Sequence, residues 1–283
     1  MIIPTHNRII ELERCLDSLT LQSFKNFEVI IVDDGSKDNI SALSKNFENV
    51  LNIRYFRLDN ASGGAARPRN KGISEAQAEW IAFLDSDDWW YPQKLERIKE
   101  CLQLGDVIYH DLDLNEQGKK HFYKTVSARA LTAPVFLDLM INHNGLVTSG
   151  VAVKKDFLQK VNGFREIELE DYDLWLRLSQ ITNRFYHIQE KLGCYWVGIT
   201  NTTQSNKREI KRVERIYNLH KNEIPALYLK EALSAKRYIQ GRIWDKMGKK
   251  TLSSNAYLFA FFFGSKQIKQ KSFLHLFKNF IFK

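Results

Sequence analysis

The chain has 283 residues, of which 44% are hydrophobic and 27% are charged, and its formal net charge is +9 at pH 7. A chain of this size can bury one large core or two modest ones, and the positive charge indicates an acidic partner such as a nucleotide, a nucleic acid or an anionic membrane. Its three cysteines lie far apart, which excludes a disulfide framework and a zinc site of the usual spacing and favours a reducing compartment.

Secreted and membrane-spanning classes are disfavoured by the same sequence. The start, Met1-Ile2-Ile3-Pro4, enters a fold without the basic lead and cleavage site of a signal peptide, so we expect none. The longest apolar stretch, 256–263, falls short of the roughly 20 residues that cross a bilayer. We therefore predict a cytoplasmic protein.

The first hundred residues alternate apolar runs with amphipathic segments. The predicted elements are, in chain order, a strand ending at Ile3, a helix over 9–19, a strand over 28–32, a helix over 39–46, a strand over 53–58, a helix over 73–78, a strand over 80–84 and a helix from Pro92. Thr5 or Asn7 can cap the first helix. This alternation predicts an α/β fold with a Rossmann-like, mostly parallel central sheet sandwiched by helices, whose strand ends meet along one edge.

The pattern becomes less regular after residue 105. It predicts strands over 107–109 and 147–153, and helices over 155–161 and 169–178. After residue 200 the sequence is strongly charged and then helical. We therefore divide the chain into residues 1–105, residues 106–200 and a helical, basic C-terminal extension over 201–283.

Two of the predicted strands run directly into carboxylates. The strand over 28–32 leads into Asp33-Asp34, and the strand over 80–84 leads into Asp85-Ser86-Asp87-Asp88. Short β-branched and aromatic runs of this kind are typical of strands buried on both faces of a parallel sheet. Ligands of open α/β sheets bind beyond the carboxyl ends of the strands, so two acid-tipped strands predict a metal-dependent nucleotide site.

Polar groups near the first acid-tipped strand suit a base and a ribose. Pro4-Thr5-His6-Asn7-Arg8 and Asp33-Asp34-Gly35-Ser36 offer hydroxyl, amide and carboxylate groups. The Asp33 carboxylate can accept a hydrogen bond from a uracil-type N–H. The alternative is a local role, in which Thr5 and Ser36 cap helices and Asp33 forms a turn.

A basic segment lies between the two acid-tipped strands. Arg67, Arg69 and Lys71 follow Gly63-Gly64, and guanidinium groups with accessible backbone N–H groups suit a phosphate. Neither the Walker pattern nor Gly-x-Gly-x-x-Gly is present. The alternative is a solvated basic loop, which Asn70 holds in place without touching a substrate.

Five short motifs occur in one order along the chain: Pro-Thr-His-Asn-Arg, Val-Asp-Asp-Gly-Ser, Arg-Asn-Lys-Gly, Phe-Leu-Asp-Ser-Asp-Asp and Glu-Asp-Tyr-Asp-Leu-Trp-Leu-Arg. Together, over about residues 1–195, they resemble the family 2 glycosyltransferases. The chain departs from the family pattern at Pro68, where Ala is commoner, and in the short stretch ahead of Pro4.

The resemblance implies a GT-A fold, an inverting transfer and a nucleotide-sugar donor, in the first place a UDP-sugar. Residues 1–105 would form the nucleotide-sugar-binding half and residues 106–200 the acceptor-binding half of one domain. The donor-binding residues that it implies are Pro4, Thr5, Asn7, Arg8, Asp33, Asp34, Arg67, Arg69, Asp85 and Ser86.

Asp85-Ser86-Asp87 is similar to the Asp-x-Asp signature of that fold, which implies Mg²⁺ or Mn²⁺. A hard divalent cation bridges carboxylate and diphosphate oxygens and stabilises the nucleotide as it leaves. The resemblance implies that Asp87 is the direct ligand and that Asp85 is a second ligand or contacts the ribose or a bound water. The alternative is an acidic loop that caps the following helix.

The resemblance assigns the catalytic pair to Glu170 and Asp171. An inverting displacement needs one base that takes the proton of the acceptor hydroxyl. The resemblance implies Asp171 for this role and Glu170 for orienting the acceptor or the helix terminus. The alternative is that both acids stabilise the start of a helix through its dipole. We expect Trp175 and Leu178 to lie in the core.

The C-terminal tail mixes apolar and basic residues. Its apolar positions are Phe273, Leu274, Leu276, Phe277, Phe280 and Ile281, and its lysines include Lys271, Lys278 and Lys283. This pattern predicts an amphipathic helix at an anionic membrane surface, and the alternative is packing onto the catalytic domain. With the family resemblance, it predicts a peripheral protein on the inner face of the cell membrane, whose acceptor is a lipid-linked surface glycan.

Two other functions stay open. Transfer onto a polyprenyl phosphate would need no base, and membrane-spanning C-terminal helices would favour it. The positive charge also suits a nucleic-acid-binding module. However, the basic residues are dispersed, and the acid-tipped strands would repel phosphate without a metal, so we expect no nucleic-acid partner.

Overall fold

The protein forms two compact units. The computed structural model describes residues 1–116, 125–126, 128–198 and 207–281. Unit 1 comprises Met1–Leu131 and Leu146–Ile199, and unit 2 comprises Thr132–Gly145 and Thr200–Lys283. Residues 132–145 therefore belong with the C-terminal helices, although the sequence places them in its middle segment. The boundary predicted at residue 200 lies outside the described residues.

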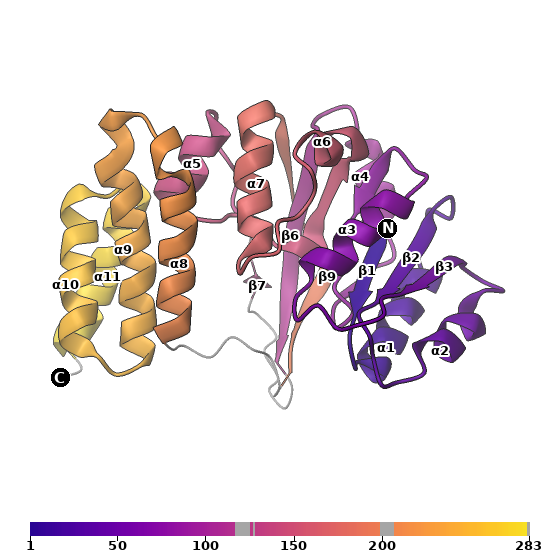
Figure 1. The fold of residues 1–283 in the computed structure, drawn as a ribbon. Coiled ribbons are helices and arrows are strands. Elements are labelled where there is room, and N and C mark those ends of the chain that lie inside the picture. Colours follow the sequence, from indigo (N-terminus) through magenta and orange to yellow (C-terminus); the bar gives the residue numbers. More distant parts are fainter. Residues whose placement is uncertain (117–124, 127, 199–206, 282–283) are drawn as a thin grey trace. The chain divides into compact units, whose positions relative to one another are not determined.

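Unit 1 begins with a parallel sheet and its crossover helices (Figure 1). These elements are β1 (Ile2–Thr5), α1 (Ile9–Thr20), β2 (Glu28–Asp33), α2 (Ile40–Phe47), β3 (Asn52–Arg57) and α3 (Ala66–Glu75). The central strand β2 pairs in parallel with β1 and β3 and is buried along its whole length, which explains its apolar run. In this register Thr5 lies opposite Asp33, so the first two motifs meet at one sheet edge, as predicted.

The second sheet of unit 1 is mixed and has the strand order β4-β8-β6-β9-β5. Its strands are β4 (Trp80–Ala82), β5 (Trp89–Trp90), β6 (Val107–Glu116), β8 (Val151–Lys154) and β9 (Phe185–Val197), with β7 (Thr125–Val126) paired to β6. The parallel pairing that we expected holds for β1–β3 and for β6 with β9, whereas β8 runs antiparallel to β4 and β6. The connection from β6 to β8 contains β7 and then α5, which belongs to unit 2 and not to the layers of this sheet.

The remaining helices of unit 1 are α4 (Lys94–Glu100), the short 3₁₀ turn η1 (Thr148–Gly150), α6 (Lys155–Lys160) and α7 (Glu170–Ile181). A parallel bridge between Ile2 and Phe83 joins the chain beyond β4 to β1 and so links the two sheets. Trp175 and Leu178 of α7 are fully buried, which confirms their predicted place in the core.

Two local predictions were wrong. Neither Thr5 nor Asn7 caps α1, because Asn7 adopts a left-handed conformation and its side chain instead accepts the backbone N–H of Lys37 at 2.7 Å. The basic segment is not a loop before a helix over 73–78. It lies inside α3, which starts at Ala66, because Pro68 occupies the first helical turn, where proline is tolerated.

Unit 2 is helical. It contains α5 (Val135–Asn142), α8 (Lys207–His220), α9 (Leu229–Lys246), α10 (Lys250–Phe263) and α11 (Lys266–Ile281), with the 3₁₀ turns η2 (Lys221–Glu223) and η3 (Ala226–Tyr228). The helix α9 contacts α5, α8, α10 and α11 (Figure 1). None of the helices in the described part of the chain combines the length and apolar character needed to cross a membrane.

Candidate functional site

The acidic loop after β4 places two carboxylates beside two arginines. Arg69 donates to Asp85 at 2.7 Å, and Arg8 forms a hydrogen-bonded ion pair with Asp87. Burial and the charge of Asp85 raise the pKa of Asp87, although Arg8 acts in the opposite direction. Each of these two carboxylates is therefore paired with an arginine from a different helix or strand end.

Asp88, to which the sequence analysis gives no role, holds this loop in place through buried hydrogen bonds. It is almost wholly buried, and it accepts the hydroxyl of Ser149 at 2.5 Å and the backbone N–H of Trp196 at 2.8 Å. The same Ser149 oxygen accepts the backbone N–H of Asp85 at 3.1 Å. Burial, followed by the charges of Asp85 and Asp87, raises the pKa of Asp88. The sequence signal available was a third acid next to an Asp-x-Asp motif.

Arg14 is a second site residue that the sequence analysis does not single out. Its guanidinium lies 4.4 Å from the ring centroid of Trp89 and 4.5 Å from that of Trp196, and it donates to the backbone carbonyl of Asp87 at 2.6 Å. Stacking between two indoles holds the guanidinium in place. No local pattern reveals this arrangement, because Trp196 is far from both partners in sequence.

Arg69 connects the acidic loop to the predicted catalytic pair. It projects from α3, is 3% exposed, and donates to Asp85 at 2.7 Å and to Glu170 at 2.8 Å. Burial acts to lower the pKa of this guanidinium, but the carboxylates of Asp85, Glu170 and Asp171 together raise it. Arg67, on the same helix, is exposed. The structure thus places only one of these two arginines between the carboxylates.

Arg69→Met should lower the free energy of unfolding by roughly 3 kcal/mol, the low end for removing one partner of a buried ion pair, since Asp85 and Glu170 keep some contact with solvent. Chemical denaturation measures this change. Arg67→Met is the matched control, and it should stay within about 0.5 kcal/mol of the wild type because its side chain is exposed. Equal effects of the two substitutions would contradict the bridging role.

Glu170 and Asp171 open helix α7, directly after Leu169 in the left-handed conformation. Asp171 accepts the backbone N–H of Tyr172 at 2.7 Å and the hydroxyl of Thr148 at 3.3 Å. Burial raises the pKa of both acids, and Arg69 partly opposes this. The Glu170 side chain is 21% exposed. An oriented carboxylate with a raised pKa can act as a general base.

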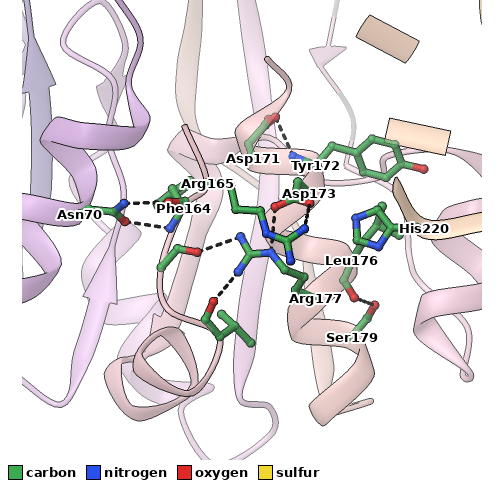
Figure 2. A network of polar contacts seen from close by, with 12 residues as sticks. Asn70, Phe164, Arg165, Asp171, Tyr172, Asp173, Leu176, Arg177, Ser179 and His220 are labelled. Atoms are coloured by element: carbon green, nitrogen blue, oxygen red, sulfur yellow. Dashed lines mark hydrogen bonds and ion pairs between the residues drawn. The ribbon is translucent and has the colours of Figure 1, made fainter. Parts of the chain in front are cut away.

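The loop ahead of α7 is fixed from two sides (Figure 2). The side chain of Asn70 accepts the N–H of Phe164 at 2.8 Å and donates to its carbonyl at 2.7 Å, so it holds this loop and not the basic segment, which is itself helical. Arg177 donates to the carbonyls of Val161 and Gly163, at 2.5 and 2.8 Å. Gly163 has φ +61, and a Cβ there would lie 2.4 Å from the Asn70 side-chain oxygen, so only glycine fits.

The ends of β1 and β2 bring the first two motifs together. The hydroxyl of Thr5 is buried and has no hydrogen-bond partner among the described residues. Asp33 accepts the N–H of Ser36 at 2.8 Å, the hydroxyl of Tyr55 at 2.8 Å and a guanidinium N–H of Arg57 at 2.7 Å. The Asp33 side chain is fully buried, and these three bonds use both of its oxygens, so they fix the carboxylate at the end of β2.

The other predicted donor-binding residues of unit 1 are mostly buried or bonded to neighbouring loops. Asp34 is buried and accepts the backbone N–H of Ser62 at 2.9 Å and its hydroxyl at 2.8 Å, so this carboxylate holds the loop after β3. Pro4 is buried in β1, and Ser86 is buried within the acidic loop. Asn7 receives the Lys37 N–H described above, and its own backbone N–H donates to the hydroxyl of Ser36 at 2.9 Å.

The acidic loop offers a donor set for the divalent cation that the family resemblance implies. Among the described residues, no group of three or more His, Cys, Asp and Glu side chains is arranged to hold a metal ion. Mg²⁺, however, usually binds through one or two carboxylates and completes its shell with water and substrate phosphates. Asp85 and Asp87 are two such carboxylates, and in this structure each is paired with an arginine. By the chemistry of their oxygens they suit Mg²⁺ or Mn²⁺.

Comparison with known sequences gives one family. A family model described as "Glycosyl transferase family 2" matches residues 1–160. An uncharacterized glycosyltransferase of Haemophilus influenzae is 32% identical over 185 residues, which cover 64% of this chain and 61% of that protein. The amylovoran biosynthesis glycosyltransferase AmsB of Erwinia amylovora is 29% identical over 208 residues, which cover 69% of this chain and 68% of AmsB. The chain thus spans less than two thirds of the Haemophilus protein.

Solved structures share the fold over nearly the whole chain. TarS 1–349 of S. aureus in complex with UDP-GlcNAc gives a TM-score of 0.64 at 20% identity, covering 95% of this chain and 82% of TarS 1–349. The mannosyltransferase PcManGT of Pyrobaculum calidifontis, in complex with GDP-Man and Mn²⁺, gives 0.61 at 14% identity, covering 95% of this chain and 76% of PcManGT. At these identities the likeness establishes the fold alone, and it confirms the predicted GT-A type.

Proposed function

Because the chain belongs to glycosyltransferase family 2, we propose that it transfers a sugar from a nucleotide diphosphate to an acceptor hydroxyl, with inversion at the anomeric carbon. One observation carries this proposal: Arg69 joins Asp85 of the acidic loop to Glu170, next to Asp171 at the start of α7. This contact supports the proposal because it links Asp85, a proposed ligand of the diphosphate-bound cation, to the start of the helix that carries the proposed base.

We propose a UDP-sugar as the donor. TarS is in complex with UDP-GlcNAc and PcManGT with GDP-Man, which supports a nucleotide sugar in this fold. In this chain the unpartnered hydroxyl of Thr5 suits a polar group of the nucleoside, and we propose that Asp33, which lies opposite Thr5, accepts the uracil N–H. Pro4 and Asn7 shape the strand end on which these groups stand.

The diphosphate would be held at the acidic loop by Asp85 and Asp87 together with the bound cation. When it is bound, Mg²⁺ or Mn²⁺ supplies positive charge to the leaving diphosphate. Arg8 orients the Asp87 carboxylate through its ion pair and adds a second positive charge beside it. Asp88, through Ser149, keeps the backbone of the loop in place.

Asp171 would remove the proton from the acceptor hydroxyl. Its hydrogen bonds with the Tyr172 N–H and the Thr148 hydroxyl fix the orientation of the carboxylate. Its pKa is raised, and a general base is most efficient when its pKa lies near the working pH. Glu170 is tied to Arg69, so we propose it as the residue that sets the start of α7 and faces the acceptor.

We propose a lipid-linked surface glycan as the acceptor. The relative AmsB is named for amylovoran biosynthesis, which supports polysaccharide assembly as the setting. The Glu170 side chain, which is 21% exposed, leaves this acid open to an approaching hydroxyl.

The donor proposal predicts metal-dependent hydrolysis of one nucleotide sugar. Purified protein should release UDP from a UDP-sugar when Mn²⁺ or Mg²⁺ is present and should stop doing so in excess EDTA, because the leaving diphosphate then lacks its counter-charge. A coupled nucleotide-release assay over a panel of UDP-, GDP-, dTDP- and CMP-sugars measures this. Hydrolysis of GDP-sugars alone would overturn the choice of uridine, and activity that persists in EDTA would overturn the metal.

A further inference from the structure

Helices α10 and α11 of unit 2 share a row of phenylalanine rings. The ring centroids of Phe261 and Phe262 are 5.5 Å apart, those of Phe261 and Phe273 are 6.1 Å apart, and those of Phe273 and Phe277 are 6.3 Å apart. We call these four residues the phenylalanine ridge. Three of them face solvent, with Phe262 63%, Phe273 54% and Phe277 57% exposed. Neighbouring rings on two helices thus form a continuous apolar surface.

The opposite side of α11 is part of the core of unit 2. Ile268 is 1% exposed and belongs to a buried cluster with Tyr238, Tyr257 and Ala260, and His275 stacks on Tyr257 at 4.8 Å. The buried face of α11 thus packs on the other helices of unit 2, not on the catalytic domain as one of the two predicted alternatives had it, and its other face is exposed. The side chains of Phe280 and Ile281 and the residue Lys283 lie outside the described residues.

The charged side chains of α10 and α11 are all lysines, and Asp245 at the end of α9 pairs with Lys250 at 3.0 Å. From Lys246 to Lys283 the sequence holds eight lysines and no Asp, Glu or Arg. Lys266, Lys269, Lys271 and Lys278 lie on α11 itself and are exposed. A folded two-helix surface that combines exposed aromatic rings with positive charge alone has the composition of an interfacial membrane-binding element.

We propose that the phenylalanine ridge and the lysines of α11 bind the surface of an anionic lipid bilayer. The rings enter the boundary between headgroups and acyl chains, while the ammonium groups pair with lipid phosphates. A second copy of the chain fits less well, because it would bring a like-charged surface against this one. The proposal does not depend on the donor or acceptor of the transfer reaction.

Vesicle co-sedimentation of the full chain tests this proposal. Wild-type protein should bind vesicles of phosphatidylcholine with phosphatidylglycerol, bind pure phosphatidylcholine much more weakly, and be released in part by high salt, because exposed charges are screened. The triple variant Phe262→Ser/Phe273→Ser/Phe277→Ser should lower the partition coefficient by at least about tenfold, since it removes the three exposed rings of the ridge.

The matched control is Leu21→Ser/Val50→Ser/Leu104→Ser, which removes three residues of unit 1 with 65%, 65% and 52% exposure. It should bind vesicles like the wild type. If the phenylalanine variant does not fold, as judged by its thermal melt, Lys266→Gln/Lys269→Gln/Lys271→Gln replaces it and should weaken binding to the anionic vesicles alone.

Three results would overturn the proposal. They are unchanged binding of the ridge variant, equal binding of wild-type protein to neutral and anionic vesicles, and no vesicle binding at all. Concentration-dependent dimerisation that the ridge variant abolishes would identify a second copy as the occupant. UDP release assayed on the same preparations separates a failure of this proposal from a failure of the proposed function.

Discussion

Asp171→Asn should lower turnover by about 10²–10⁴-fold, the range for loss of a general base, while affinity for UDP stays near the wild-type value. The substitution keeps the size of the side chain, its oxygen can still accept the Tyr172 N–H and its NH₂ can donate to the Thr148 hydroxyl, but it removes the ability to take a proton. Steady-state transfer rates and calorimetric titration with UDP measure the two quantities separately. An equal loss of UDP affinity would instead make Asp171 structural or a donor ligand.

The same assignment has a consequence for pH. A base must be deprotonated to act, so activity falls as the pH drops through its pKa. Burial raises the pKa of Asp171, so the acidic limb of kcat/KM should lie at a higher pH than that of an ordinary aspartate. In Asp171→Asn, the residual activity should lose this limb. If the acidic limb of the kcat/KM profile stays unchanged in the variant, the group that titrates there is not Asp171.

Asp87→Asn should reduce metal-dependent turnover by at least about 10²-fold, comparable with loss of one strong electrostatic stabiliser of the transition state. The amide keeps the shape of the side chain but is a much poorer ligand for a hard cation. Arg8, which loses its ionic partner, is part-exposed and can turn to solvent, so the fold should persist. Turnover measured against Mn²⁺ concentration reports the effect directly.

Asp156→Asn provides the control for this prediction. Asp156 is an exposed carboxylate on α6 that pairs with Lys160 at 2.9 Å, and its loss should leave both turnover and the Mn²⁺ response unchanged. If Asp87→Asn kept a wild-type Mn²⁺ response, the cation would have to bind elsewhere.

The sequence predicts the parts of this site that lie close together along the chain. The apolar runs before Asp33 and Asp85 identify the strands, and period-3.6 patterns identify α1, α4 and α7, because buried strands and amphipathic helices leave local signatures. The meeting of Thr5 with Asp33 also follows from sequence, since adjacent parallel strands end at the same edge.

Contacts between distant segments leave no such signature. The Arg14 sandwich needs Trp89 and Trp196 from two strands of the mixed sheet, and the Asp88 anchor needs Ser149 from η1. Arg69 resembles a phosphate ligand in sequence because its neighbours are basic. Only the folded chain shows that its nearest charges are two carboxylates.

The chain passes between its two units three times, at 131–132, 145–146 and 199–200. A truncation after residue 200 would therefore not isolate unit 1 cleanly. It would leave α5 without α9, against which it packs, and so expose the apolar residues Val135, Leu139 and Met140 to water. Such a fragment should aggregate, whereas one in which a flexible linker also replaces residues 132–145 should stay monomeric.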